Sequence, residues 1–291
     1  MLRISALITF LLIGIQLNAQ IQYSGYIGSF PITLVSYRSQ PGDIAAHYKY
    51  ERYDDPIKLA GFFDDGKLRF RENDKNQKVR AILDFKGFSF KADSALGIWQ
   101  DFKTCKEYQV LLCKEVDLSR GYDKKYLNKE IIQYGSTDDH YFKTVSSKEG
   151  GTSWGKVTAV KIFEKSTDRL VQVIPLDCEH VSYNSITIDD YNFDGVQDFA
   201  VFERSYAGPN TTSIYILRQP NSDKYVVSDI EGTSLHFSKY EKVIYEHNQC
   251  CGGRSHYNAT YKIINNKMVL IQERCLSFDD ELNDFVEVIC D

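Results

Sequence analysis

Oxygen-bearing side chains recur at every second position at the start of one short segment, residues 190–198, whose sequence is DYNFDGVQD. Such spacing lets a loop wrap around a hard cation, and Ca²⁺ takes six to eight oxygen ligands at about 2.3–2.6 Å. Gly195 lies where the loop must turn back, with a positive φ that glycine adopts at little cost. The sequence therefore predicts a bound calcium ion with a structural role. The expected ligands are four side chains and one backbone carbonyl, from Asp190, Asn192, Asp194, Val196 and Asp198.

The residues around this loop indicate strands rather than helices. An EF-hand would need a bidentate Glu at its twelfth position, which is Val201 here. The flanking runs 185–188 and 199–202 are short and rich in β-branched or aromatic residues, as strands are. We therefore expect a strand, the loop and a second strand. An acidic surface turn without metal is the alternative, although carboxylates spaced so closely repel one another unless a cation neutralises them.

The first 19 residues have the pattern of a secretory signal peptide. Arg3 precedes an apolar run over residues 4–17, and a small residue ends the segment. This run is shorter than the ~20 apolar residues that a membrane-spanning helix needs, and an uncleaved anchor helix is the alternative. No second long apolar run follows. We therefore expect a periplasmic or secreted protein that has no membrane span after signal cleavage.

The charge of the chain argues against nucleic acid as a partner. One of the 35 Lys and Arg residues lies in the signal segment, so 34 remain against 40 Asp and Glu, a net charge of −6. An acidic chain is poorly suited to neutralise phosphates. One basic cluster is interleaved with Glu72 and Asp74, and we interpret it as a solvated strand face rather than a phosphate site. Its members are Arg69, Arg71, Lys75, Lys78 and Arg80.

All seven cysteines follow the signal segment, and an oxidising compartment favours disulfides. Because the number is odd, at least one thiol is free or paired between chains. Spacing leaves the connectivity open. Cys105 and Cys113 could close a local turn, and Cys250 or Cys251 could reach Cys275 across a hairpin. A zinc site is the rival interpretation, but the sequence contains no C-x-x-C pair.

Short alternating runs separated by Gly, Asp and Asn fill most of the chain, as in antiparallel β-sheets. We predict an all-β protein with two antiparallel domains, the first a meander or barrel. The second is a β-sandwich or an incomplete propeller-like sheet with the calcium loop. One short helix is expected over residues 124–132. The expected order is a signal peptide (1–19), an N-terminal β domain (20–102), a connector (103–139) and a C-terminal calcium-loop domain (140–291).

The second half of the chain resembles a known group of exported proteins. Residues 188–195 run into residues 198–201, and this signature is similar to that of bacterial β proteins with one calcium loop of the FG-GAP or VCBS type. Residues 213–215 and 250–251 follow in an order that resembles immunity proteins protecting bacteria from lysozyme-like effectors. Those proteins are related to periplasmic i-type lysozyme inhibitors. The resemblance covers about residues 155–280 and implies a protein partner, namely a lysozyme-like hydrolase. The N-terminal half has no counterpart in those inhibitors.

The clearest pattern of a binding loop lies in residues 248–257, with the sequence NQCCGGRSHY. Gly252 and Gly253 should form a tightly turned, exposed tip, and a pinned tip loses little entropy on binding. Lysozyme-type enzymes carry a carboxylate pair in a cleft. Hydrogen-bond donors could bind these carboxylates, and an aromatic ring beside the donors could anchor the loop in the cleft. The alternative is a hairpin end whose polar residues face water. The expected partner-binding residues are Arg254, Ser255, His256 and Tyr257.

We expect no enzyme activity and assign no catalytic residues. Residues 151–155 match the pattern G-x-S-x-G, the nucleophile elbow of many hydrolases. That motif requires a strand before the nucleophile, here Ser153, and a helix after it. Residues 157–163 instead alternate as a strand does. The match is therefore interpreted as a chance one.

A glycan- or surface-binding module of the envelope is the alternative function. Tyrosines are frequent near the start of the mature chain, and at two-residue spacing Tyr48 and Tyr50 share one strand face. An exposed aromatic face could bind sugars, but aromatic side chains are also typical of ordinary sheet packing. The tyrosines concerned are Tyr23, Tyr26, Tyr48, Tyr50 and Tyr53.

Overall fold

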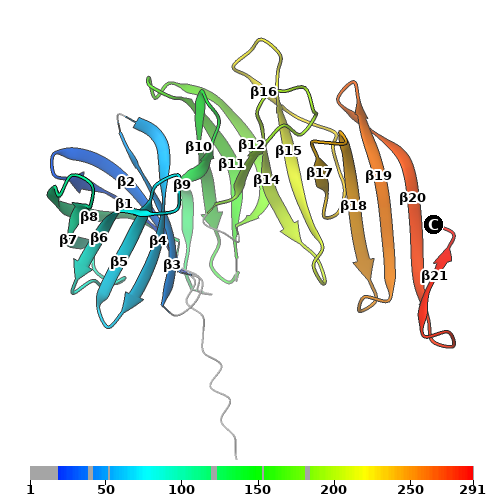
Figure 1. Cartoon of the computed structure of the whole chain (residues 1–291), viewed down its shortest axis with the longest axis horizontal. Helices are drawn as coiled ribbons and strands as arrows, with labels where there is room; N and C mark the ends of the chain where they lie inside the picture. The colour runs from blue at the N-terminus through cyan, green and yellow to red at the C-terminus, as the bar shows by residue number, and fades with distance from the viewer. Residues whose placement is uncertain are drawn as a thin grey trace, which may run out of the picture.

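The structure, a computed structural model, describes residues 19–38, 42–51, 53–118, 123–152, 154–180 and 184–290. All regular elements among these residues are strands, which confirms the predicted all-β class. None of the described residues belongs to a helix long and apolar enough to cross a membrane. The expected signal segment lies almost wholly outside the described residues. Figure 1 shows a closed barrel at the N-terminal end and a row of three further sheets that ends at the C-terminus.

The barrel is an antiparallel meander of eight strands closed by pairing of the first strand with the last. Alternation of apolar and polar residues explains it, since β5 exposes and buries successive residues along its whole length. The largest fully buried barrel side chains include Tyr23, Tyr48, Phe70 and Phe85, which form a packed interior. The strands are β1 (Ala19–Ile27), β2 (Phe30–Arg38), β3 (Asp43–Tyr50), β4 (Tyr53–Asp64), β5 (Lys67–Asn73), β6 (Val79–Lys86), β7 (Ser94–Asp101) and β8 (Glu107–Asp117).

Three antiparallel sheets follow the barrel, and we call them the first, second and third sheet in chain order. The first sheet contains β9 (Tyr126–Ser136), β10 (His140–Lys148), β11 (Gly155–Glu164) and β12 (Leu170–His180). The second contains β13 (Ile186–Asp189), β14 (Asp198–Ser205), β15 (Thr211–Arg218) and β16 (Tyr225–Val227). The third contains β17 (His236–Ser238), β18 (Val243–Cys250), β19 (Ser255–Ile264), β20 (Lys267–Asp279) and β21 (Asp284–Val288).

Apolar side chains hold these sheets together in a row. One buried cluster joins the first sheet to the second, with the Phe142 and Phe199 ring centroids 4.6 Å apart. Another joins the second sheet to the third, and includes Tyr215 of β15 and Ile244 of β18. Each sheet between two neighbours therefore buries both faces, whereas the third sheet has a neighbour on one face only (Figure 1). Several of its side chains, such as Ile264 and Ile271, are correspondingly exposed.

The barrel docks on the first sheet through a smaller apolar cluster and several hydrogen bonds. Val35 of β2 packs with Ile131 and Ile132 of β9. The backbone N–H of Ile132 donates to Gln22 of β1 at 3.0 Å, and its carbonyl lies 3.2 Å from His47 Nε2 of β3. The barrel and the row of sheets are thus joined by an interface that contains polar groups as well as apolar ones.

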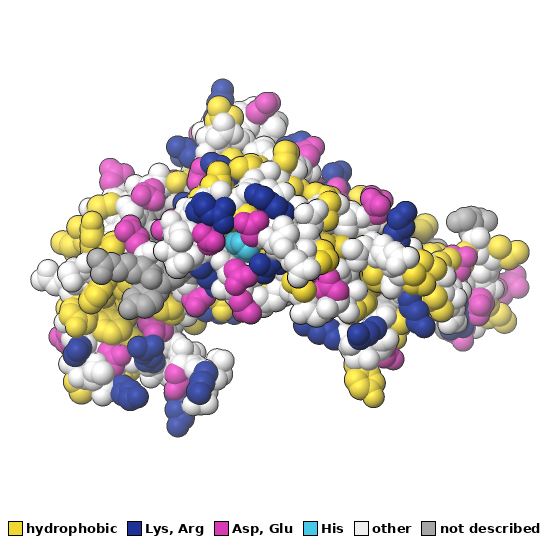
Figure 2. Space-filling model, turned by 90° about the horizontal axis from the view of Figure 1, so that it is seen from above, with side chains coloured by type: hydrophobic (Ala, Val, Ile, Leu, Met, Phe, Trp, Pro, Cys, Tyr) yellow, Lys and Arg dark blue, Asp and Glu magenta, His cyan; other side chains and the backbone are white. Residues whose placement is uncertain are grey.

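Ion pairs join the turns of neighbouring sheets. Arg218 at the end of β15 contacts Asp139, between β9 and β10, at 2.7 Å. Arg169, between β11 and β12, contacts Asp223, between β15 and β16, at 3.1 Å. Seen from above, side chains of both charges mix over the middle of the molecule, while hydrophobic side chains gather over its two ends (Figure 2). Much of the charge that the sequence displays is therefore paired within the fold.

The helix expected over residues 124–132 does not form, because most of this segment belongs to strand β9. The helix was expected because Leu127, Ile131 and Ile132 fall near one helical face. In the structure, Ile131 and Ile132 are consecutive buried residues of a strand whose pairing with β10 is irregular. Leu127, which the helix would have buried, is 69% exposed. The stretch treated as a connector also contains β8, which closes the barrel.

The disulfide connectivity also differs from the two pairings suggested by spacing. Cys275 bonds to Cys290, with Cα atoms 5.3 Å apart. The reason is the register of the third sheet, in which Cys275 lies opposite Val288 at the end of β21, two residues before Cys290. Other cysteines among the described residues carry free thiols, and these are Cys105, Cys113, Cys178, Cys250 and Cys251.

Candidate functional site

The acidic loop connects β13 to β14, so the predicted order of strand, loop and strand is confirmed. Its aromatic residues anchor it between the second and third sheets. The Tyr191 ring lies 4.9 Å from that of Tyr215 and 4.8 Å from that of Phe237, and Phe193 also packs near Phe237.

Side-chain oxygens of the loop accept hydrogen bonds from its own backbone. Asp190 accepts the N–H groups of Asp194 at 3.0 Å and Gly195 at 2.8 Å, and Asp194 accepts that of Val196 at 2.8 Å. Gly195 has a φ of 89°, as expected at the sharp turn, and the neighbouring Phe193 also has a positive φ of 62°. The loop is thus curled around the Asp190 carboxylate.

Asp198, the last expected ligand, is fully buried. Its two oxygens accept the backbone N–H groups of Tyr191 at 3.0 Å and Arg218 at 2.8 Å. The pKa of this carboxyl is raised to about 6, chiefly by burial and also by the nearby charges of Asp194 and Asp190, while the two backbone hydrogen bonds oppose the shift. Asp198 therefore holds the loop to β15, and three acidic groups lie close enough to affect one another.

The donor types fit calcium, since the loop offers carboxylate and amide oxygens from Asp190, Asn192, Asp194 and Asp198. Each of these carboxylate oxygens has a second lone pair beyond the one used by a backbone N–H. However, no three His, Cys, Asp or Glu side chains converge as a metal cluster in the described part of the chain. The loop is closed by its own hydrogen bonds and offers oxygen atoms of the types that bind calcium. Calcium coordination stays a prediction.

The loop contacts all three sheets. Gln197 accepts the backbone N–H of Asp138 in the β9–β10 turn at 2.8 Å. Asn192 donates to Asn266 in the β19–β20 turn at 3.1 Å. On the same side, Lys239 between β17 and β18 forms an ion pair with Asp189 at 2.5 Å. A group bound in this loop would therefore stabilise the joint between sheets rather than a single hairpin. Sequence reasoning missed these partners because they lie in turns far away along the chain.

The expected partner-binding residues lie at the β18–β19 hairpin end and the start of β19. The tip is tightly turned as predicted, with positive φ at Cys251, Gly252 and Gly253. Arg254, however, pairs with Asp280 at 2.6 Å, and its guanidinium lies 4.7 Å from the centre of the Phe278 ring. This arginine is therefore already held by the β20–β21 end of the same sheet.

The other three residues do not form one donor surface. His256 Nε2 lies 3.0 Å from the Gly253 carbonyl oxygen, and its ring packs on Phe285. Tyr257 donates from its hydroxyl to Glu273 at 3.1 Å. Because Ser255 and Tyr257 alternate with His256 along a strand, they face the opposite side of the sheet. The four residues are consecutive in the chain, but their side chains are divided between the two faces of the third sheet.

The tyrosines considered for a glycan-binding face are largely interior. Tyr23 and Tyr48 are buried in the barrel, and the Tyr48 hydroxyl donates to Glu72 at 2.8 Å. Tyr26 is 51% exposed, while Tyr50 packs edge-on against Tyr48. The side chain of Tyr53 lies outside the described residues, as does Ser153 of the G-x-S-x-G match. The prediction of an exposed aromatic face that includes Tyr48 is therefore wrong.

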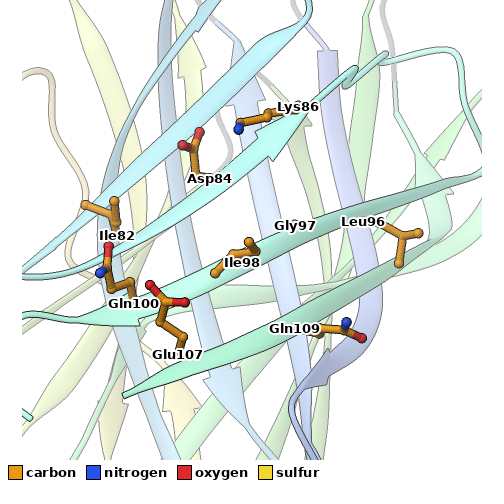
Figure 3. A pocket seen from close by; sticks show the side chains of 9 residues that line it. All are labelled: Ile82, Asp84, Lys86, Leu96, Gly97, Ile98, Gln100, Glu107 and Gln109. Atoms are coloured by element: carbon orange, nitrogen blue, oxygen red, sulfur yellow. The ribbon is translucent and has the colours of Figure 1, made fainter. Parts of the chain in front are cut away.

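A groove of about 420 Å³ lies on the outer wall of the barrel across β6, β7 and β8. Figure 3 shows its side chains projecting from these three neighbouring strands. Ile82, Leu96 and Ile98 supply apolar surface, and Leu96 is 70% exposed. The polar and remaining lining residues are Asp84, Lys86, Gly97, Gln100, Glu107 and Gln109. The sequence did not reveal this groove, because its residues have the alternating pattern that any strand with one face on the outside of a barrel would have.

No protein-family model matches this chain, and comparison with curated proteins finds no significant relative.

Proposed function

We propose that this chain is an exported, calcium-binding protein–protein interaction module. The observation that carries the proposal is the acidic loop, whose Asp189, Asn192 and Gln197 each contact a different turn of the neighbouring sheets. A cation at the loop would fix the positions of the hairpin ends, and a pre-ordered surface binds with a smaller entropy loss. The exposed apolar residues of the third sheet, such as Ile264 and Ile271, are further support for a binding role.

The partner class we propose is a lysozyme-like peptidoglycan hydrolase, which makes the chain an inhibitor or immunity protein. This choice rests on the resemblance of residues 155–280 and on the tightly turned tip at Gly252 and Gly253. Since Arg254 is bound to Asp280, inhibition through this arginine requires it to exchange partners. An exposed pair of this kind contributes little to stability, so the exchange is inexpensive.

An inhibition assay tests the partner class. The mature chain should slow at least one lysozyme-type hydrolase, and Arg254→Ala should weaken inhibition about tenfold, the loss of one charge-assisted contact. Tyr257→Ala should have little effect on inhibition, because Tyr257 faces the other side of the sheet. Asp280→Ala is the matched control, because it frees Arg254 without removing it, and inhibition should persist. If the wild-type protein slows no hydrolase in a panel of such enzymes, the inhibitor proposal is wrong.

Removal of calcium should lower the melting temperature. A ligand present at about 100 times its dissociation constant stabilises the native state by roughly 2.7 kcal/mol, which corresponds to roughly 5–10 °C for a chain of this size. Differential scanning calorimetry with calcium and with a chelator measures the shift. Asp194→Ala should abolish the shift, since it removes an exposed carboxylate ligand whose own hydrogen bonds, from Val196 and Asn192, lie within the loop. Identical melting curves with and without calcium would count against the metal.

An envelope glycan-binding module is the second candidate, and the groove of Figure 3 favours it. Amide and carboxylate side chains such as Gln100, Gln109 and Glu107 can bond sugar hydroxyls in pairs, beside the apolar surface of Ile98. A glycan panel decides between the two candidates. Binding that is lost in Gln109→Ala while hydrolases remain unaffected would favour the glycan module over the inhibitor.

A further inference from the structure

A second concave surface lies where the barrel meets the first sheet. It is a cavity of about 460 Å³ between the outer wall of β4 and β5 and the ring of Tyr134 from β9. Strands β4 and β9 lie next to each other at this junction (Figure 1). Pockets of 300–1,000 Å³ between two folding units are the usual location of small-ligand sites. The cavity is remote from the acidic loop in sequence and uses none of its residues.

Alternation in the barrel strands places positive charge at this cavity. Leu59 of β4 and Phe70 and Glu72 of β5 point inward and are buried, so Lys58 and Arg71 point outward. Ala60 lies directly opposite Arg71 in the β4–β5 register, so Lys58 is a diagonal neighbour of Arg71 on the same face. The β5–β6 turn adds a third cation. The polar residues at the cavity are Lys58, Arg71, Asn73, Asp74, Lys75 and Gln77.

The side chains of the three cations at the cavity are unpaired, unlike those of Arg69 and Arg80 in the basic cluster. Arg69 pairs with Asp84 at 2.7 Å, and Arg80 lies 3.6 Å from Glu72. By contrast, the side chains of Lys58, Arg71 and Lys75 make no hydrogen bond or ion pair with any described residue. The one carboxylate at the cavity, Asp74, already accepts the backbone N–H groups of Asn76 and Lys78 within its own turn. An excess of about two positive charges therefore surrounds the cavity.

Tyr134 gives the cavity an aromatic wall. Its ring lies 5.9 Å from that of His47, which is fully buried. The backbone N–H of Tyr134 donates to Asn184 at 3.2 Å, so the residue is held from the side of the second sheet. The cations can hydrogen-bond an oxyanion of a ligand, and the half-buried ring of Tyr134 can pack against the remainder of that ligand. Such a pairing suits a charged ring compound better than a bare ion.

We propose that this junction cavity binds a small saccharide that carries a phosphate or carboxylate group. Arg71 provides the planar fork that bonds such an oxyanion through two N–H groups, and Lys58 and Lys75 add point charges. Asn73 and Gln77 can bond hydroxyl groups, and the Tyr134 ring packs on the sugar. The sequence alone suggested a solvated strand face, because the pairing of Arg69 and Arg80 and the approach of Tyr134 are visible only in three dimensions.

Isothermal titration calorimetry with four probes tests the site: glucose 6-phosphate, glucuronate, inorganic phosphate and glucose. The two anionic sugars should bind more tightly than phosphate or glucose, and their ranking tells whether phosphate or carboxylate is the preferred group. Arg71→Gln should weaken binding about tenfold or more, the loss of charge-assisted hydrogen bonds. Tyr134→Leu should weaken the anionic sugars while leaving inorganic phosphate unchanged.

Arg69→Gln is the matched control, since Arg69 lies on the same outer face of β5 but is bound to Asp84 and does not line the cavity. It should bind all probes as the wild type does. Circular dichroism confirms that each variant is folded, which is expected for outward residues. The proposal is overturned if no anionic sugar binds at millimolar concentration, if Arg71→Gln binds as tightly as the wild type, or if Arg69→Gln loses as much affinity as Arg71→Gln.

Discussion

Replacing Asp198 with alanine should destabilise the protein by roughly 2–5 kcal/mol, even without calcium. The carboxylate is fully buried and accepts the backbone N–H groups of Tyr191 and Arg218. Truncation leaves both donors buried without an acceptor, and each such group costs about 1–3 kcal/mol. Because Tyr191 belongs to the loop and Arg218 to the end of β15, the loss also separates the loop from the second sheet. Urea denaturation in the presence of a chelator measures the change.

Asp194→Ala is the matched control for this experiment. Asp194 is exposed, and it accepts the backbone N–H of Val196 at Oδ1 and a side-chain N–H of Asn192 at Oδ2. In chelator, its loss should cost about 1–2 kcal/mol, because each such hydrogen bond contributes about 1 kcal/mol and water can replace an exposed acceptor. The two substitutions thus separate an architectural carboxylate from one whose main use would be metal binding. Equal stability of Asp198→Ala and the wild type would mean that the buried hydrogen bonds contribute nothing.

Local patterns predicted the elements that depend on neighbouring residues. The alternation of 185–188 and the short apolar run 199–202, rich in β-branched or aromatic residues, predicted the strands beside the acidic loop. Two adjacent asparagines are a local turn signal of the same kind, and Asn265 and Asn266 between β19 and β20 both have positive φ, which asparagine tolerates better than most residues. The curvature of the acidic loop at Gly195 follows from the same kind of local requirement.

Pairing between distant segments could not be predicted in this way. Closure of the barrel requires β1 to pair with β8, about 90 residues further along, and nothing in either strand specifies the other. Ile131 and Ile132 suggested a helix because they fall near one helical face with Leu127. In the structure they lie on an irregular strand and pack against the barrel residue Val35. Long-range packing overrode the local period there.

The candidate sites show the same division. The oxygen donors of the loop were visible in sequence because a cation-binding loop is a local device. The ion pair of Arg254 with Asp280, and the joint lining of one cavity by Arg71 and Tyr134, were not visible. A side chain's availability for a ligand depends on which partners the fold gives it, and those partners lie on other strands. The Arg254 side chain is therefore paired with a carboxylate, whereas the Arg71 side chain is unpaired.

Acid should weaken the junction between the barrel and the first sheet through His47. This side chain is fully buried, and burial lowers its pKa to about 4, which the hydrogen bond to the Ile132 carbonyl only partly opposes. The unfolded chain takes up the proton near pH 6.5 and the folded chain only near pH 4. The stabilising contribution of neutral His47 is therefore fully present above about pH 6.5 and is lost as the pH falls towards 4. The total loss is roughly 3 kcal/mol, at about 1.4 kcal/mol per pH unit.

Urea denaturation at several pH values between 7 and 4 measures this dependence, and comparison with His47→Gln isolates it from other acid-sensitive groups. The His47→Gln variant should be less stable at pH 7. Between pH 7 and 4, its free energy of unfolding should fall less steeply with pH than that of the wild type, by the contribution of about one proton. His236→Gln serves as the control for the substitution itself, because His236 is exposed. His140, whose pKa burial also lowers, is present in all three proteins and cancels in the comparison. If His47→Gln and the wild type have the same slope, His47 does not carry the acid sensitivity of the junction, and the titration must then lie in the ionic contacts around it.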